Sequence, residues 1–236
     1  MRGSDINIDI TRKCTLKCRH CYNHSGEMNN DELASDELFR IMNDLASTRP
    51  DNFCICGGEP LLKKEIIFRF IDHQKKINSE MNIGMVTNGE LLTESIGEKL
   101  IYYGLNNIQF SIDGATENSH DWLRNKKGLF ENLLHTIMQL NILRRKAKSD
   151  IKISAVCCLN KRNYEELPKI IELCTRLGID ILRVQPLMKM GRAKEGLDAY
   201  SLSKNEYIQA ANYLLVNRYK NCLLYTSPSP RDPKTS

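Results

Sequence analysis

The feature that most constrains the fold of this chain is a repeated alternation of short apolar runs with longer segments of helical periodicity. Strands that alternate with helices build βα units and a parallel sheet. The sequence therefore predicts an α/β fold. Six runs of strand length are expected, at residues 5–11, 52–56, 81–87, 106–112, 150–157 and 179–184.

Two of the intervening segments carry an apolar stripe at helical spacing, which predicts helices that each bury one face. Their members are Tyr164, Leu167, Ile170, Ile171, Cys174 and Leu177 in one, and Leu129, Phe130, Leu133, Leu134, Ile137 and Met138 in the other. A third helix is expected to begin near Ser203, because Ser203 and Glu206 have the spacing of a capping box.

The number of units indicates an incomplete barrel. Six βα units in a chain of 236 residues are too few for a closed eight-stranded barrel, so we expect a partial (β/α)6 TIM-like barrel. The chain is long enough for one domain with a sizeable core. In such folds the chemistry gathers at the carboxyl ends of the strands.

Three cysteines follow the first expected strand, at Cys14, Cys18 and Cys21. Three thiolates on one loop can hold an iron–sulfide cluster, and three ligands to four irons leave one iron open to a small molecule. The alternative is structural zinc, which takes four ligands, with His20 or His24 as the fourth. Zinc sites more often consist of two separated cysteine pairs, so the spacing favours the cluster.

The CxxxCxxC spacing, together with the GGEP run at 57–60, resembles the radical S-adenosylmethionine (radical SAM) superfamily. The resemblance extends over roughly residues 5–192. The stretches SIDG, HDWLR and QPLMKMGRA are most similar to the peptide-modifying and anaerobic sulfatase-maturating, SPASM-type branch. The resemblance implies the partial-barrel core, with a [4Fe-4S] cluster on the three cysteines and S-adenosylmethionine as cofactors.

The resemblance also implies an enzymatic activity. Such an enzyme cleaves S-adenosylmethionine reductively, and the 5′-deoxyadenosyl radical abstracts a hydrogen atom from a substrate, here a peptide or protein side chain. Flavodoxin or ferredoxin is the expected electron donor, because clusters of this kind have low potentials. Two alternatives stay open. One is a small-molecule substrate, as in molybdenum-cofactor cyclisation, and the other is a non-catalytic zinc-binding module.

Glycines and a carboxylate after the second strand are the first candidates for cofactor binding. The resemblance implies that Gly57 and Gly58 let the backbone approach the amino group of S-adenosylmethionine. Glu59 either pairs with that ammonium or fixes the turn, and the first role is favoured. The resemblance also implies that His20 lies near the adenine, a task that Tyr22 could share.

Polar residues after the third and fourth strands complete the candidate set. Asn88 and Asp113 end strands that reach the cofactor in this superfamily, although such residues also commonly make turns. Ser111 and Arg124 match cofactor-binding residues of the sulfatase-maturating relatives, and a guanidinium suits the cofactor carboxylate. Contacts from the fifth strand and from Gln185 are not assigned. The cysteines without ligand spacing are expected to be small buried hydrophobes, namely Cys54, Cys56, Cys157, Cys158 and Cys174.

Composition excludes several classes of protein. The net charge of +5 comes from scattered basic residues with acidic ones between them, so no nucleic-acid surface is indicated. No apolar run approaches the roughly 20 residues that span a bilayer, and no signal peptide is evident. Nine cysteines in a chain of this kind are expected to be reduced, which favours the cytoplasm.

The end of the sequence departs from the pattern of the rest. Residues 222–236 are rich in serine and proline, and the run CLLYTSPSPRD resembles an in-frame translation of a sequencing adapter. We therefore expect a truncated core at 1–221 and an artefactual, disordered tail at 222–236, with Cys222 not a ligand. Relatives of this kind often continue into a cysteine-rich region with auxiliary clusters.

Overall fold

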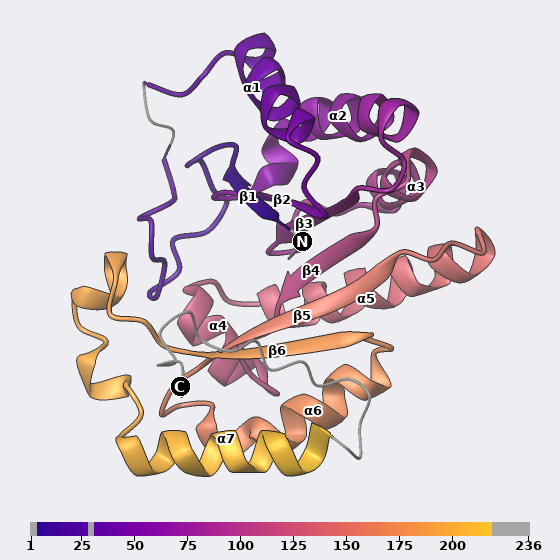
Figure 1. The fold of residues 1–236 in the computed structure, drawn as a ribbon. Helices are drawn as coiled ribbons and strands as arrows, with labels where there is room; N and C mark the ends of the chain where they lie inside the picture. The colour runs from indigo at the N-terminus through magenta and orange to yellow at the C-terminus, as the bar shows by residue number, and fades with distance from the viewer. Residues whose placement is uncertain (1–3, 28–30, 219–236) are drawn as a thin grey trace, which may run out of the picture.

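A computed structural model describes residues 4–27 and 31–218, and the expected tail at 222–236 lies outside the described residues. Six parallel strands form one sheet in sequence order, which makes a half-barrel (Figure 1). The predicted partial barrel is thus confirmed. The strands are β1 (Asp5–Asp9), β2 (Asn52–Cys56), β3 (Asn82–Thr87), β4 (Asn107–Ser111), β5 (Lys152–Leu159) and β6 (Ile181–Pro186).

Helices connect consecutive strands, a last helix follows β6, and the helices lie on the outer side of the curved sheet (Figure 1). They are α1 (Ser35–Ser47), α2 (Lys64–Ile77), α3 (Glu94–Tyr103), α4 (Glu117–Arg124), α5 (Leu129–Lys146), α6 (Leu167–Arg176) and α7 (Lys204–Arg218). Short 3₁₀ turns occupy Pro60–Lys63, Tyr164–Glu166, Gly191–Lys194 and Asp198–Tyr200. Within the described residues, no helix is long and apolar enough to cross a membrane.

The core lies between the sheet and its helices. Side chains alternate across a strand, so every second residue of β2 to β4 faces the helices. Phe53, Ile55, Ile83, Ile108 and Phe110 are completely buried there. The residues between them, such as those at positions 54, 56 and 109, face the opposite side and are only partly buried. This division leaves the inner face of the half-barrel open for a ligand.

Most predicted elements are confirmed, with differences at their ends. β1 ends two residues earlier than the predicted strand, whereas β5 and β6 each begin and end two residues later than predicted. The capping box is confirmed, because the Glu206 amide donates to Ser203 Oγ at 3.3 Å and the Ser203 amide donates to Glu206 Oε2 at 2.6 Å. Met138 is 48% exposed, so its assignment to the buried stripe of α5 is wrong.

Candidate functional site

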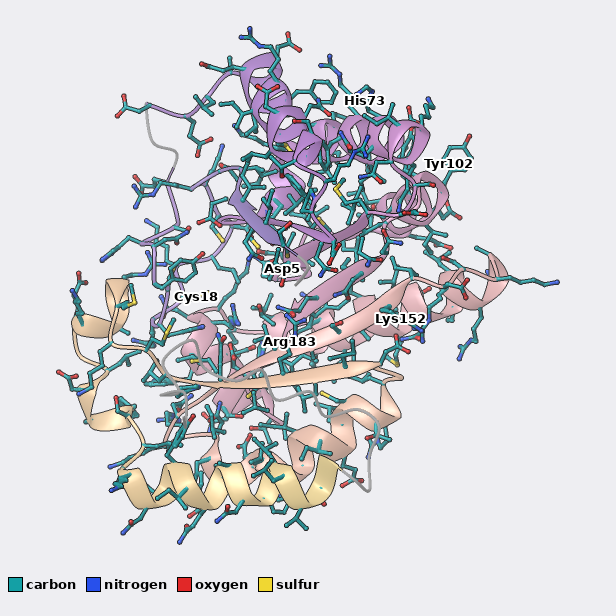
Figure 2. All side chains as sticks on the ribbon, in the orientation of Figure 1. Asp5, Cys18, His73, Tyr102, Lys152 and Arg183 are labelled. Atoms are coloured by element: carbon teal, nitrogen blue, oxygen red, sulfur yellow. The ribbon has the colours of Figure 1, made fainter. Side chains whose placement is uncertain are left out.

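A cavity of about 270 Å³ lies at the carboxyl ends of the strands. In Figure 2, Lys152 at the start of β5 and Cys18 near the cavity lie on opposite sides of the molecule. All three predicted metal ligands border the cavity, and so do seven of the eight predicted cofactor-binding residues. These seven are His20, Gly57, Gly58, Asn88, Ser111, Asp113 and Arg124. The topology therefore brings together residues that are up to 110 positions apart.

In the loop after β1, buried and exposed side chains alternate, and the cysteines face the cavity. Leu16 and Cys18 are buried and pack against Leu129, whereas Lys17 and Arg19 are exposed. The Arg19 amide donates to the Leu123 carbonyl at 2.9 Å, which ties the loop to the end of α4. The loop is thus held on one side by the α4–α5 region.

The sulfur of Cys14 lies among hydrogen-bond donors. The Leu16 amide donates to Cys14 Sγ at 3.4 Å, and Asn88 Nδ2 lies 3.8 Å from the same atom. Burial raises the pKa of Cys14 to about 11, more than the Leu16 amide lowers it. This thiol therefore needs a positively charged partner, such as a metal centre, to become a thiolate near neutral pH.

Cys18 and Cys21 have donors of their own. Arg124 Nη1 lies 3.8 Å from Cys18 Sγ, and the Ser25 amide donates to Cys21 Sγ at 3.3 Å. Burial raises the pKa of Cys18, and the charge of Arg124 only partly opposes it. Hydrogen bonds to sulfur ligands are among the factors that set the potential of an iron–sulfur cluster. The chain thus supplies at least one such donor to each of the three predicted ligands.

The turn after β2 is fixed by a close approach of two backbones. A Cβ on Gly57 would lie 2.6 Å from the Thr11 carbonyl oxygen, and one on Gly58 would lie 2.3 Å from the Lys13 carbonyl oxygen. Gly57 also has φ +142°, a conformation that other residues rarely adopt. The glycines are therefore required by the loop that carries the cysteines, and they still form part of the cavity wall.

Glu59 is the one predicted cofactor-binding residue that does not border the cavity. It is completely buried, and its carboxylate accepts from Thr87 Oγ1 at 2.8 Å and from the amides of Leu61 and Asn88 at 3.1 and 2.9 Å. Both of its oxygens are therefore occupied by the chain itself. This position agrees with the alternative role, in which Glu59 fixes the turn and ties it to β3.

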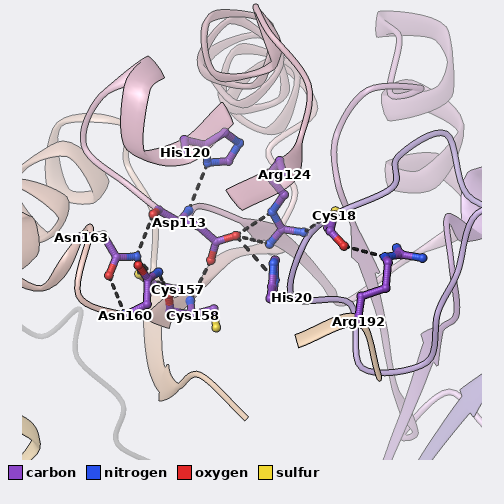
Figure 3. A network of polar contacts seen from close by, with 10 residues as sticks. All are labelled: Cys18, His20, Asp113, His120, Arg124, Cys157, Cys158, Asn160, Asn163 and Arg192. Carbon is purple, nitrogen blue, oxygen red and sulfur yellow. Dashed lines mark hydrogen bonds and ion pairs between the residues drawn. The ribbon is translucent and has the colours of Figure 1, made fainter. Parts of the chain in front are cut away.

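An ion pair buried between β4 and α4 lies at the centre of the polar network in Figure 3. Asp113 is completely buried, and its Oδ2 accepts from Arg124 Nε at 2.6 Å, while its Oδ1 accepts from the Cys158 amide at 2.7 Å. Burial by itself would raise the pKa of Asp113, but the Arg124 guanidinium and nearby histidines lower it below its usual value. Both carboxylate oxygens of Asp113 thus already have hydrogen-bond partners within the protein.

Two buried nitrogens on the cavity wall have no hydrogen-bond partner among the described residues. They are His20 Nδ1 and Arg192 Nη2. Arg192 is held in place because its Nε donates to the Cys18 carbonyl at 2.8 Å and its amide donates to the Cys21 carbonyl at 2.9 Å. Unpartnered buried nitrogens are costly, so they fit a wall that binds a polar ligand.

Several residues that border the cavity were not predicted from the sequence to belong to the site. Arg192 belongs to the QPLMKMGRA stretch, whose likeness to the family was the available signal. Cys56 and Cys158 border the cavity too. Cys158 is buried as predicted, but Cys54 and Cys56 are only partly buried, so the prediction of buried thiols is wrong for these two. Gln185, left unassigned, is a further wall residue. By contrast, Cys157 and Cys174 are buried as predicted.

The residues present fit an iron–sulfur cluster better than a single ion. Among residues 4–27 and 31–218, no group of three or more His, Cys, Asp or Glu side chains is placed to hold one metal ion. A four-iron cluster instead binds each thiolate to a different iron, so its ligands need only surround a common space. Cys14, Cys18 and Cys21 do so around the cavity.

A scan against family models matches residues 8–174 to the Radical SAM superfamily. The chain is 29% identical over 202 residues to the "Sporulation killing factor maturation protein SkfB" of Bacillus subtilis (strain 168), covering 86% of this chain and 47% of that protein. It is 32% identical over 191 residues to the "AdoMet-dependent heme synthase" of Methanosarcina barkeri, covering 80% of this chain and 52% of that protein.

Among solved structures, Streptococcus suis SuiB bound to precursor peptide SuiA matches with a TM-score of 0.75 and 16% sequence identity. The match covers 97% of this chain and 49% of SuiB. At this level of identity the likeness shows the fold. The chain spans about half the length of the curated relatives it matches.

Proposed function

The chain belongs to the radical SAM superfamily, and from this premise we propose that it is the core of an enzyme that cleaves S-adenosylmethionine reductively. Cys14, Cys18 and Cys21 would hold the [4Fe-4S] cluster. The observation that carries the proposal is their meeting in one cavity with the GGEP turn and with the ends of β3 and β4.

When bound, the cluster would supply the electron that breaks a carbon–sulfur bond of S-adenosylmethionine, and the 5′-deoxyadenosyl radical so released would abstract a hydrogen atom from the substrate. The chain's own residues hold this chemistry in place. Arg124 donates to Cys18 Sγ, and Asn88 donates to Cys14 Sγ and to Thr15 Oγ1, so the cluster loop is fixed from the end of α4 and from the end of β3. The cavity walls around the cofactor would be formed by Gly57, Gly58, Ser111, His20 and Arg192.

The proposed substrate is a peptide or protein side chain. A relative named for maturing the sporulation killing factor and a structural neighbour bound to a precursor peptide support this class. The mouth of the cavity adds exposed apolar groups, because Tyr22 and Met188 border it and are each 51% exposed. Methionine side chains adapt to varied partners, which suits a peptide.

Two further parts of the proposal concern the cell. Flavodoxin or ferredoxin is the proposed electron donor, because a low-potential cluster needs a low-potential reductant. All eight cysteines of the described residues are free thiols, which suits a reducing compartment, so we place the protein in the cytoplasm.

A small-molecule substrate is the second candidate, because the heme synthase of M. barkeri is 32% identical to this chain. The two candidates differ in what stimulates turnover. Consumption of a candidate peptide, with a mass change that depends on S-adenosylmethionine, supports the first. Turnover with a tetrapyrrole or a nucleotide but with no peptide supports the second.

The activity itself can be tested without knowing the substrate. We would rebuild the cluster anaerobically, add S-adenosylmethionine and dithionite, and quantify 5′-deoxyadenosine by chromatography. Cys18→Ala serves as the negative control, and Cys174→Ala as the matched control for loss of a buried thiol. Product from the wild type and from Cys174→Ala, but not from Cys18→Ala, is expected. Bound iron without product would contradict the proposed activity for this chain.

A further inference from the structure

We propose that an acidic electron-transfer protein docks on a cationic face outside the cluster loop, made by Arg19, Lys126, Lys127, Lys161 and Arg162 around Trp122. The inference rests on the proposed function, since it concerns the electron that the cluster must receive. The five cations come from three separate segments of the chain. All five are exposed.

Contacts with Trp122 show that these residues form one surface. The guanidinium carbons of Arg19 and Arg162 lie 5.4 and 4.6 Å from the centre of the indole ring. Lys126 and Lys127 line the same shallow hollow as Trp122. Lys161 lies beside this surface. Its backbone amide donates to the carbonyl of Tyr200, and the ring centres of Tyr200 and Trp122 are 4.6 Å apart.

The balance of charge on this face is positive. Lys126 is paired with Glu90, Glu117 borders the hollow, and the Glu206 carboxylate lies near Lys161, so three carboxylates face the five cations. Asp121 also borders the hollow, but it is buried and its Oδ1 accepts from the Phe130 amide at 2.9 Å. A net positive surface around an aromatic residue suits a protein partner of opposite charge and speeds its encounter.

The face is joined directly to a predicted cluster ligand. Arg19 directly follows Cys18 and precedes His20 in the sequence. Its Nε donates to the Trp122 carbonyl at 2.9 Å. Trp122 also lies two residues before Arg124, whose Nη1 lies 3.8 Å from Cys18 Sγ. An electron arriving at this face therefore has a short path through covalent and hydrogen bonds to Cys18.

The position of the face favours an electron donor over a substrate. None of Arg19, Trp122, Lys127 and Arg162 borders the cavity, whereas a substrate has to reach the radical inside it. An electron donor needs only to approach the cluster from outside. The loop residues Leu16 and Cys18 separate the cationic face from the cavity. Both are buried against Leu129, whereas Lys17 and Arg19 beside them are exposed.

The test compares two reductants on the reconstituted protein. We would follow anaerobic bleaching of the cluster absorbance by stopped flow, with flavodoxin hydroquinone or with dithionite, in the wild type and in Lys127→Glu/Arg162→Glu. Lys64→Glu/Lys152→Glu is the matched control, because both lysines are exposed and neither belongs to the cationic face. Electrostatic steering changes association rates by about tenfold or more, and salt screens it.

We expect flavodoxin to reduce the cluster of Lys127→Glu/Arg162→Glu at least about tenfold more slowly than that of the wild type. The rate should also lose most of its salt dependence, while the control and the dithionite rates stay unchanged. An unchanged flavodoxin rate would overturn the proposal. So would a change seen only in the KM of a peptide in dithionite-driven turnover, which would assign the face to the substrate. Absence of any dithionite-reducible cluster in the wild type would instead contradict the proposed function.

Discussion

Arg124 joins a buried carboxylate to a predicted cluster ligand, since its Nε lies 2.6 Å from Asp113 Oδ2 and its Nη1 lies 3.8 Å from Cys18 Sγ. The charge of the guanidinium is balanced by Asp113 whether or not Cys18 is ionised. A thiolate at Cys18 therefore gains a hydrogen bond from Arg124 but little net positive charge. The remaining stabilisation of that thiolate has to come from a metal centre, which agrees with its raised pKa.

Asp113→Asn should destabilise the protein strongly, because it leaves the Arg124 guanidinium buried without its counter-charge. Removing one partner of a buried pair costs about 3–5 kcal/mol. Urea unfolding of the cluster-free protein at neutral pH measures the change. Asp198→Asn is the matched control, since it breaks the exposed pair with Lys189 and should cost at most about 1 kcal/mol. Equal costs for the two variants would show that the buried pair does not hold the site together.

Iron binding should depend on three of the eight described cysteines. Single alanine variants of Cys14, Cys18 and Cys21 should lose most of the roughly four irons per chain expected for a [4Fe-4S] cluster. Cys157→Ala should keep them, because Cys157 is buried away from the cavity wall. Iron assay and absorbance after anaerobic reconstitution give the readout. Full iron content in Cys14→Ala or Cys21→Ala would remove that residue from the ligand set.

The order and type of the strands could be predicted because each apolar run is bounded by a turn and alternates with a helical stripe. Strand ends were harder, since Cys158 and Leu159 continue β5 only by virtue of pairing with Gln185 and Pro186. Such pairing depends on residues far away in the sequence. Met138 shows the same limit, because its spacing fits the buried stripe of α5 although no neighbouring element covers it enough to bury it.

The members of the site could be predicted from motifs, but their partners could not. The cysteine spacing, GGEP and the polar strand ends selected residues that do surround one cavity. Nothing in the sequence indicates that Glu59 is bound by Thr87 and Asn88, since these contacts arise when β2 and β3 lie side by side. Arg192 was missed for the same reason, because its contacts with the cysteine loop span more than 170 residues.

Gly58→Ala should perturb the cysteine loop, because the new Cβ would lie 2.3 Å from the Lys13 carbonyl oxygen and 2.8 Å from that of Arg12. Backbone atoms cannot move aside as a flexible side chain can, so we expect a loss of stability on the order of 2 kcal/mol and weaker cluster retention. Gly84→Ala is the control, since its Cβ would meet only ordinary contacts at 3.6 Å. Thermal unfolding and iron content measure both effects, and similar values for the two variants would contradict the role of the close approach.

His120 should make the stability of the cluster-free protein fall in mild acid. It is completely buried, and its Nδ1 accepts from the Asp113 amide at 3.1 Å, which requires the neutral ring. Burial lowers the pKa of His120 to about 3, and the Asp113 carboxylate offsets only part of this effect. In the unfolded chain the pKa returns to its ordinary value of 6.5. The unfolded state then binds a proton that the folded state does not, so the free energy of unfolding decreases as pH falls from about 6.5 toward about 3.

The slope due to one histidine is at most about 1.4 kcal/mol per pH unit, which urea titrations between pH 4.5 and 7 (about 2.5 pH units) can resolve. His120→Gln keeps an acceptor for the Asp113 amide and should flatten the slope relative to the wild type. The other charged groups near His120 are Asp113, Arg124 and His20, and all of them remain in this variant. His135→Gln, an exposed position on α5, should retain the wild-type slope. If His120→Gln shows that slope too, protonation of His120 does not drive the loss of stability in acid.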